Sequence, residues 1–147
     1  PSLFALSFLL VLFLSQMAHA CPEIDRVPDL NCDGVLQITV LGDSLVFGIG
    51  DTRNSNSGGY VLRTERRFRN SNVSNLGRPG FRAEQLRTLV QDIFRKRSLR
   101  AERAALLKSD VIVLDIGRND FWLFEPTTAT LDNLKFISGY LRRQIER

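Results

Sequence analysis

A serine at the end of a predicted buried strand is the first residue in this sequence whose setting suggests chemistry. Ser44 lies in Gly42-Asp43-Ser44-Leu45, directly after a run of mostly apolar, partly β-branched residues. Such a run predicts a strand that is covered on both faces, and open α/β sheets place their ligands at the carboxyl ends of these strands. A serine there, close to the start of a helix, could act as a nucleophile in a field that favours developing negative charge. Glycine, aspartate and serine are also common turn residues, so a purely structural role stays open.

Two later turns carry groups that could stabilise an oxyanion. Nucleophilic cleavage of an ester needs a hydroxyl, a base that takes its proton, and hydrogen-bond donors directed at the carbonyl oxygen. The candidate donors are the backbone N–H of Ser44, the backbone N–H of Gly80 and the side-chain amide of Asn119. A glycine leaves its N–H unshielded, and a carboxamide donates without adding charge. We therefore expect Ser44, Gly80 and Asn119 to form one catalytic site.

Four bulky apolar residues, Phe121-Trp122-Leu123-Phe124, directly follow the third of these groups. They could line an acyl or aryl pocket, with Phe121 and Trp122 as substrate-binding residues. The alternative, equally consistent with the sequence, is that they anchor their loop in the core.

Acidic side chains also lie near the predicted strand ends. For Asp43, Asp115 and Asp120 we expect structural roles, such as hydrogen bonds within turns, rather than acid or base catalysis. A metal site built from these three carboxylates lacks further ligands at useful spacing. We expect neither a metal nor another cofactor.

Strands and helices that could position these groups alternate along the chain. Apolar runs predict strands, and helical spacing of apolar residues predicts helices. The predicted strands span residues 35–41, 73–76 and 110–116, and the predicted helices span residues 60–68, 86–94, 98–108 and 128–147. This alternation implies parallel strands joined by right-handed crossovers, with helices covering the sheet. The loops at 42–45, 77–80 and 117–120 would then share one edge of that sheet.

At these three loops the sequence resembles the SGNH (GDSL-type) hydrolase family. Gly42-Asp43-Ser44-Leu45 looks like the first block of the family, with Ser44 as nucleophile. Asn75–Gly80 looks like the second block, which places an oxyanion N–H at Gly80, and Gly117-Arg118-Asn119-Asp120 matches the third block, Gly-x-Asn-Asp. The resemblance covers about residues 35–147. It implies a flavodoxin-like three-layer α/β/α sandwich with a parallel sheet, and hydrolysis of esters or thioesters through an acyl-enzyme without a metal.

One block of the family, the Asp-x-x-His that supplies the acid and the base, has no counterpart in this sequence. The single histidine, His19, lies within residues 1–20, which we interpret below as part of a signal peptide. The family fold also has about two more strands after the third block. We therefore expect residues 35–147 to be a partial hydrolase domain whose carboxyl-terminal strands are missing. On this view the strand at 110–116 is an apolar edge, and the fragment is nearly inactive although its full-length parent is an esterase, lipase or thioesterase.

The sequence of residues 1–20 is typical of a secretory signal peptide that is incomplete at its start. An apolar stretch from Leu3 to Leu14 is followed by Ala18-His19-Ala20, which suits signal peptidase, while the start of the signal is incomplete. The apolar stretch is shorter than the ~20 residues that cross a bilayer, so we expect no stable membrane span. The mature chain is expected to begin at Cys21 and to be secreted or periplasmic.

Cys21 and Cys32 are the only cysteines and lie just ahead of the first long strand. An exported chain with one close pair predicts a disulfide, which would pin an amino-terminal segment at residues 21–34. Unpaired thiols or a lipidated Cys21 are the alternatives. Two cysteines without nearby histidines make a zinc site improbable.

The charge distribution and the alternative functions complete the interpretation. The formal net charge is +4, and the basic clusters at 63–69 and 95–103 contain acidic residues as well. They indicate solvated helix faces rather than a nucleic-acid surface.

A nucleotide- or flavin-binding domain is an alternative function. Gly48-Ile49-Gly50 resembles the start of the glycine-rich dinucleotide-binding motif, but Arg53 occupies the position of the third glycine of that motif. A non-catalytic module that binds glycan or lipid is another. We expect a small ester or thioester as the partner, and the oligomeric state stays open.

Overall fold

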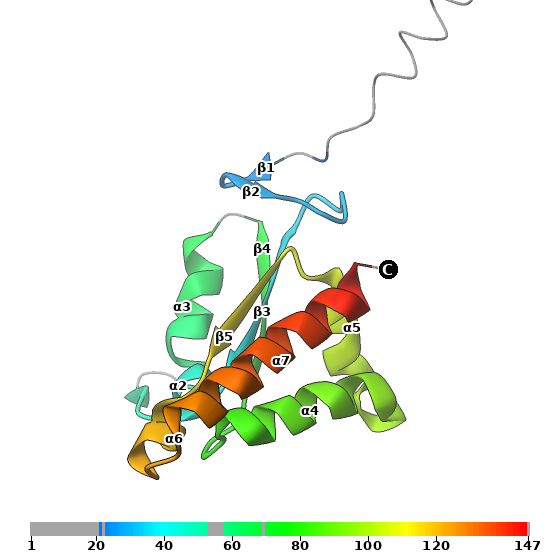
Figure 1. Ribbon diagram of the computed structural model, residues 1–147. Helices are drawn as coiled ribbons and strands as arrows, with labels where there is room; N and C mark the ends of the chain where they lie inside the picture. The colour runs from blue at the N-terminus through cyan, green and yellow to red at the C-terminus, as the bar shows by residue number, and fades with distance from the viewer. Residues whose placement is uncertain (1–20, 22, 53–57, 69, 147) are drawn as a thin grey trace, which may run out of the picture.

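A parallel sheet forms the centre of the computed structural model, which describes residues 21, 23–52, 58–68 and 70–146 (Figure 1). Its strands are β3 (Leu36–Gly42), β4 (Ser71–Gly77) and β5 (Val111–Asp115), in the order β4-β3-β5. The register pairs Gly42 with Gly77 on one side and with Asp115 on the other. The three strands therefore end side by side, at the edge where the candidate residues were expected.

Helices cover both faces of this sheet. They are α2 (Ser44–Phe47), α3 (Gly59–Arg67), α4 (Ala83–Arg95), the 3₁₀ helix η2 (Arg97–Leu99), α5 (Arg100–Lys108), α6 (Arg118–Trp122) and α7 (Thr127–Ile145). Helix α3 lies on one side of the sheet, and α4, α5 and α7 lie on the other (Figure 1). The predicted α/β fold with a parallel sheet between helices is confirmed.

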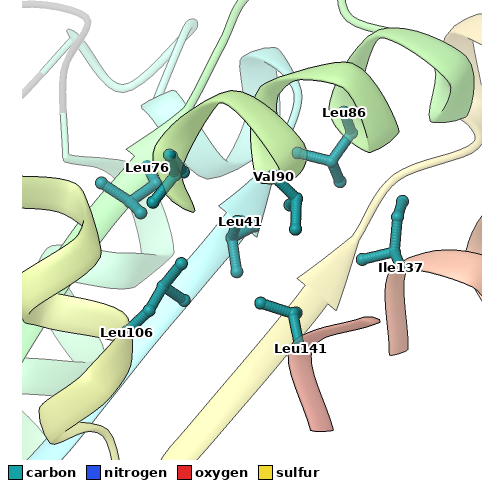
Figure 2. Packing of buried hydrophobic residues seen from close by; sticks show 8 residues of the cluster. Leu41, Leu76, Leu86, Val90, Leu106, Ile137 and Leu141 are labelled. Carbon is teal, nitrogen blue, oxygen red and sulfur yellow. The ribbon is translucent and has the colours of Figure 1, made fainter. Parts of the chain in front are cut away.

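Each face of β3 packs into its own hydrophobic cluster, because side chains alternate between the two faces of a strand. Leu36, Ile38 and Val40 pack with Val46 of α2 and Val61 of α3. On the opposite face, Leu41 and Leu76 meet apolar residues of three helices. These are Leu86, Val90, Ile93, Leu106, Ile137 and Leu141, most of which Figure 2 shows converging on Leu41. Their spacing along α4 and α7 follows one helix face, which is why the sequence predicted both helices.

Strand β5 is half-buried and lies at an edge of the sheet in the described part of the chain, as expected for residues 110–116. Among the described residues it pairs with β3 alone, and its side chains are half-buried, with Val113 37% exposed. In the described part of the chain it therefore forms one edge of the sheet, and β4 forms the other.

A small amino-terminal unit lies at the opposite end of the sheet from α2 and α6 (Figure 1). Strands β1 (Glu23–Ile24) and β2 (Val27–Pro28) form an antiparallel hairpin, and a disulfide joins Cys21 to Cys32. The Asp110 carboxylate accepts the backbone N–H groups of Leu30 and Gln37, at 2.7 and 2.8 Å, and so ties this unit to the sheet. Two-residue strands are too short to show a sequence period, so the hairpin was not predicted.

The interpretation of residues 1–20 as a signal peptide, including His19, lies outside the described residues. Within the described ranges, no helix combines the length and the apolar character that crossing a bilayer requires.

Candidate active site

Ser44 is the first residue of α2, the single helical turn that follows β3. The Asp43 carboxylate caps this turn by accepting the backbone N–H of Leu45 at 2.9 Å, and Asp43 itself is only 2% exposed. Gly48, in a left-handed conformation with φ of 102°, ends the turn and donates its N–H to the Ser44 carbonyl. The backbone of the half-buried Ser44 is thereby fixed at both sides. Because helix dipoles sum over aligned peptides, one turn supplies less of the favourable field than the sequence suggested.

Two glycines allow α2 to lie directly against the ends of the strands. A Cβ atom at Gly42 would fall 2.1 Å from the Asp115 carbonyl oxygen, and one at Gly77 would fall 2.2 Å from the Phe47 nitrogen. The Arg78 N–H donates to the Gly42 carbonyl at 2.9 Å and joins the first and second loops. A Cβ atom at Gly42 would also fall 2.4 Å from the Val46 side chain of α2. Only glycine fits at Gly42 and Gly77, since at each position a side chain would collide with backbone atoms that cannot move away.

Gly80 is exposed and has a positive φ of 79°, a backbone conformation that L residues with side chains seldom adopt. Apart from Gly80 itself and its two neighbours in the chain, no atom of the described residues lies within 4 Å of the place where its Cβ would stand. The space beside this residue is therefore open.

Asn119 lies in α6, which begins after Gly117 at the end of the third loop. Its side-chain nitrogen Nδ2 donates to the carbonyl oxygen of Phe81 at 2.7 Å. This bond orients the carboxamide next to the loop that contains Gly80. A carboxamide nitrogen carries two hydrogens, so the second N–H can still donate to another acceptor.

Asp120, 4% exposed, ties α6 to the two helices beside it. Its carboxylate accepts the backbone N–H of Ala83, the first residue of α4, at 3.0 and 3.2 Å, and the Thr130 hydroxyl of α7 at 3.4 Å. An ion pair between Arg82 and Glu125 spans the same two loops. The second and third loops are thus bound to each other, and Asp120 has the structural contacts expected of it.

Tyr60 of α3 connects the other side of the site to the end of β5. Its hydroxyl donates to Oδ2 of Asp115 at 2.8 Å. Burial, followed by the hydrogen bond to this carboxylate, raises the pKa of Tyr60 above its usual range. Sequence reasoning did not select Tyr60, because no local pattern shows which strand end a helix residue will reach.

The aromatic run after Asn119 is turned toward solvent. The exposed fractions are 77%, 68%, 62% and 93% for Phe121, Trp122, Leu123 and Phe124. The alternative that these residues anchor their loop in the core is therefore wrong. Phe121 and Phe124 line a cleft of about 390 Å³ together with Thr130, whereas Trp122 contacts the Phe121 ring without lining the cleft.

The structure brings the turns of Ser44, Gly80 and Asn119 to one edge of the sheet, where α2, α6 and the start of α4 gather (Figure 1). The second and third loops share the Asn119–Phe81 bond, and the first and second share the Arg78–Gly42 bond. A base for the Ser44 hydroxyl is not evident in the described part, which contains no histidine because His19 lies outside it.

Comparisons with known proteins found similarity in sequence and in fold. Residues 40–146 match the sequence profile of the GDSL-like lipase/acylhydrolase family. Among solved structures, the fold is similar to that of AlinE4, an SGNH-hydrolase family esterase, with a TM-score of 0.59 and 20% sequence identity. The match covers 76% of this chain and 56% of that one, so the chain spans little more than half the length of the esterase structure. No curated protein matches this sequence.

Proposed function

This chain belongs to the GDSL-like lipase/acylhydrolase family, and from that premise we propose that it is a serine ester hydrolase with Ser44 as nucleophile. One observation carries the proposal. The turns that contain Ser44, Gly80 and Asn119 follow three adjacent strands, and backbone and side-chain hydrogen bonds tie these turns together. A hydroxyl and two kinds of uncharged N–H donor at one edge are the groups that acyl transfer needs.

In the proposed reaction, the Ser44 oxygen attacks the carbonyl carbon of an ester or thioester while a base takes the hydroxyl proton. The negative charge that develops on the carbonyl oxygen is stabilised by the N–H groups of Ser44 and Gly80 and by the free N–H of the Asn119 carboxamide. Collapse of this intermediate breaks the bond to the alcohol or thiol, which leaves with a proton and gives acyl-Ser44. Water then attacks the acyl group, releases the acid and returns the proton to Ser44.

We propose that the base comes from outside the described residues, as the family resemblance to an Asp-x-x-His block implies. The three carboxylates at this edge of the sheet are poor candidates because each already accepts a structural hydrogen bond. Asp43 accepts from Leu45, Asp115 accepts from Tyr60, and Asp120 accepts from the Ala83 N–H. Their contacts hold the turns in place instead.

The cleft lined by Phe121, Phe124 and Thr130 is the proposed site for the acyl group. Phe121 and Phe124 give it an apolar wall, and Trp122 packs against Phe121 in an edge-to-face contact of 6.1 Å between ring centres. An apolar wall formed by residues that closely follow Asn119 in the sequence favours an ester whose acyl part is apolar.

Export is part of the same proposal. The disulfide between Cys21 and Cys32 supports a secreted or periplasmic protein, because disulfides persist in oxidising compartments.

Hydrolysis of p-nitrophenyl esters by the full-length protein tests the function. We expect Ser44→Ala to lower the rate by about three orders of magnitude or more, since it removes the nucleophile. Ser138→Ala is the matched control, because Ser138 is an exposed serine of α7 that bonds only its own helix in the structure. Full activity in Ser44→Ala would contradict the proposal, and ester binding without turnover in the wild type would favour a non-catalytic lipid-binding module.

A further inference from the structure

The corner between α4 and α5 is one of the two basic clusters of the chain. Residues 92–103, which form this corner, contain five basic and two acidic residues, a net charge of +3 against +4 for the whole chain. Both acidic residues already have a cationic partner, since Asp92 pairs with Lys96 at 2.7 Å and Glu102 pairs with Arg78 at 3.5 Å. The other basic residues of the corner are Arg95, Arg97, Arg100 and Arg103.

These four arginines have no ion pair among the described residues. Arg95, Arg97 and Arg100 are exposed, and Arg103 is half-buried. Arg100 and Arg103 are three residues apart in α5 and therefore lie on the same side of that helix. A guanidinium group has five N–H donors in a planar fork, which can bind a carboxylate or a similar oxyanion through two parallel hydrogen bonds. The corner thus presents positive charge that no carboxylate of the described chain neutralises.

The backbone of the corner is fixed before any partner binds. Phe94 packs edge-to-face on Tyr140 of α7, with 5.9 Å between the ring centres, and Leu99 packs against the same hydrophobic cluster. The Lys96 N–H donates to the Asp92 carbonyl at 2.7 Å, and the Leu99 N–H donates to the Lys96 carbonyl at 3.2 Å. Binding therefore has to order only the arginine side chains, which lowers its entropic cost.

The residues of the corner favour an acidic polysaccharide over other polyanions. Short runs rich in arginine and lysine, such as residues 95–100, are typical of patches that bind nucleic acid or heparin. The structure describes residues 92–103 in full, and none of them is an exposed large hydrophobic residue that could enter a membrane interface. Phe94, the one aromatic residue of the corner, packs against the core and cannot stack on a base.

The shape of the corner separates a sugar chain from duplex DNA. The four arginines follow the bend from α4 through η2 into α5, so they do not lie along a straight line. Duplex DNA is stiff over distances far longer than this bend and would contact few of them. A flexible polysaccharide can curve around the bend and place an acidic group beside each arginine.

The corner is distant from the candidate site. Helix α4 begins at Ala83, whose N–H donates to the Asp120 carboxylate, and it ends at Arg95. With a rise of 1.5 Å per residue, its 13 residues span about 20 Å. In Figure 1, α4 runs from the side of α6 to the corner with α5. The carboxylates of Asp43 and Asp115 lie at the site edge with Asp120, so a polyanion is attracted to the corner rather than to the site.

We propose that the α4–α5 corner binds an anionic polysaccharide, one that carries carboxylate or sulfate groups, and leaves the candidate site accessible. The arginines bind acidic groups along the sugar chain and hold the protein on the polymer. This binding goes beyond the proposed hydrolysis and needs no catalysis. Because it releases counterions from the polymer, its affinity falls steeply with salt.

The test measures binding of the full-length protein to heparin, which carries both sulfate and carboxylate groups, and to neutral dextran of similar length. We expect binding to heparin alone, weakened by about tenfold or more between 50 and 200 mM salt. Binding to both polymers, or to neither, would overturn the proposal. Duplex DNA and phosphatidylglycerol vesicles serve as competitors at equal charge concentration. If either displaces labelled heparin as well as unlabelled heparin does, the assignment to a polysaccharide is wrong.

Variants locate the surface. Arg97→Gln with Arg100→Gln should lower the heparin affinity by about tenfold or more, because two of the four unpaired guanidinium groups are lost. Arg66→Gln with Arg67→Gln is the matched control, since both arginines are exposed in the last turn of α3 and have no ion pair among the described residues. Equal loss in the two double variants would overturn the assignment to the corner. Arg97→Lys with Arg100→Lys keeps both charges and should retain more affinity than the glutamine variant, and an equal loss would overturn the role of charge.

Ester hydrolysis distinguishes this inference from the proposed function. Ser44→Ala should bind heparin as the wild type does, and heparin should leave the hydrolysis of a p-nitrophenyl ester by the wild type unchanged. Inhibition by heparin that persists in Arg97→Gln with Arg100→Gln would place the polyanion at the site and overturn the proposal. Heparin binding without any hydrolysis would contradict only the proposed function, and Ser44-dependent hydrolysis without heparin binding would contradict only the inference drawn from the corner.

Discussion

Ser44, Gly80 and Asn119 are each positioned by the local structure around them. Asp43 caps the turn of Ser44, the positive φ at Gly80 keeps the neighbouring space open, and one hydrogen of the Asn119 amide goes to the Phe81 carbonyl. The second hydrogen of that amide is left for an oxyanion. The catalytic proposal therefore depends at this scale on three small polar groups rather than on a strongly charged residue.

Asn119→Ala is expected to lower the rate of ester hydrolysis by about 10²–10³, which is the usual cost of losing one oxyanion donor. The loss should fall on kcat with little change in KM, since the donor acts in the transition state. Asn31→Ala is the matched control, because the Asn31 side chain makes the same kind of hydrogen bond, from Nδ2 to the Lys108 carbonyl at 2.9 Å. This bond lies at the opposite end of the sheet, before β3 and β5. A rate for Asn119→Ala equal to that of the control would remove Asn119 from the site.

Gly80→Ala is expected to slow hydrolysis, because a methyl group and a strained backbone would disturb the N–H that faces the oxyanion. The strain of a left-handed alanine costs about 1–2 kcal/mol of unfolding free energy. Gly34→Ala serves as the control, since Gly34 has a φ of 76° and equally open surroundings. Both variants should lose similar stability in urea unfolding, and only Gly80→Ala should lose activity. A parallel loss of activity in both would indicate general destabilisation instead.

Much of the candidate site could be predicted from the sequence, because each candidate residue lies in a short motif directly after a strand. Ser44, Gly80 and Asn119 each follow a predicted strand, so their common edge follows from the parallel topology alone. The bond of Tyr60 to Asp115 and the outward turn of Phe121–Phe124 could not be predicted, since both depend on tertiary contacts and on a backbone φ without a sequence signal.

At the scale of elements, the site depends on how closely α2 approaches the sheet. Gly77→Ala would place a methyl group 2.2 Å from the Phe47 nitrogen, and the backbone atom cannot move away as a side chain can. We expect a loss of about 3 kcal/mol or more in urea unfolding, at the upper end for overpacking. Gly139→Ala in α7 should instead be neutral or stabilise the protein by about 0.5–1 kcal/mol, because only the flexible end of Arg143 lies near. Unchanged stability in Gly77→Ala would contradict the close approach of α2.

The link from α3 to β5 through Tyr60 predicts a pH dependence of stability. Its pKa is raised in the folded protein by burial and by the Asp115 hydrogen bond, from an ordinary value of 10.0. The contribution is therefore fully present below about pH 10, and it is lost as the pH rises further, because the unfolded chain releases this proton first. Unfolding free energies measured from neutral to alkaline pH should fall more steeply above pH 10 in the wild type than in Tyr60→Phe. Identical slopes for the two proteins would contradict the link.

In the described part of the molecule, two different structural units lie at opposite ends of one sheet. The disulfide-bonded hairpin lies ahead of the strands, and the candidate site lies after them (Figure 1). The helices that cover both faces were predictable from apolar spacing, as was the central position of a strand as apolar as β3. The edge position of β5 in the described part of the chain was expected from the resemblance to a family whose fold has further strands.

The measurement that tests the central claim most directly is mass spectrometry of the full-length protein after reaction with a fluorophosphonate, which labels only an activated serine. We predict one adduct per chain, located on Ser44, absent from Ser44→Ala and formed more slowly in Asn119→Ala and Gly80→Ala than in their matched controls. An unlabelled wild-type protein, or an adduct on any other serine, would contradict the account.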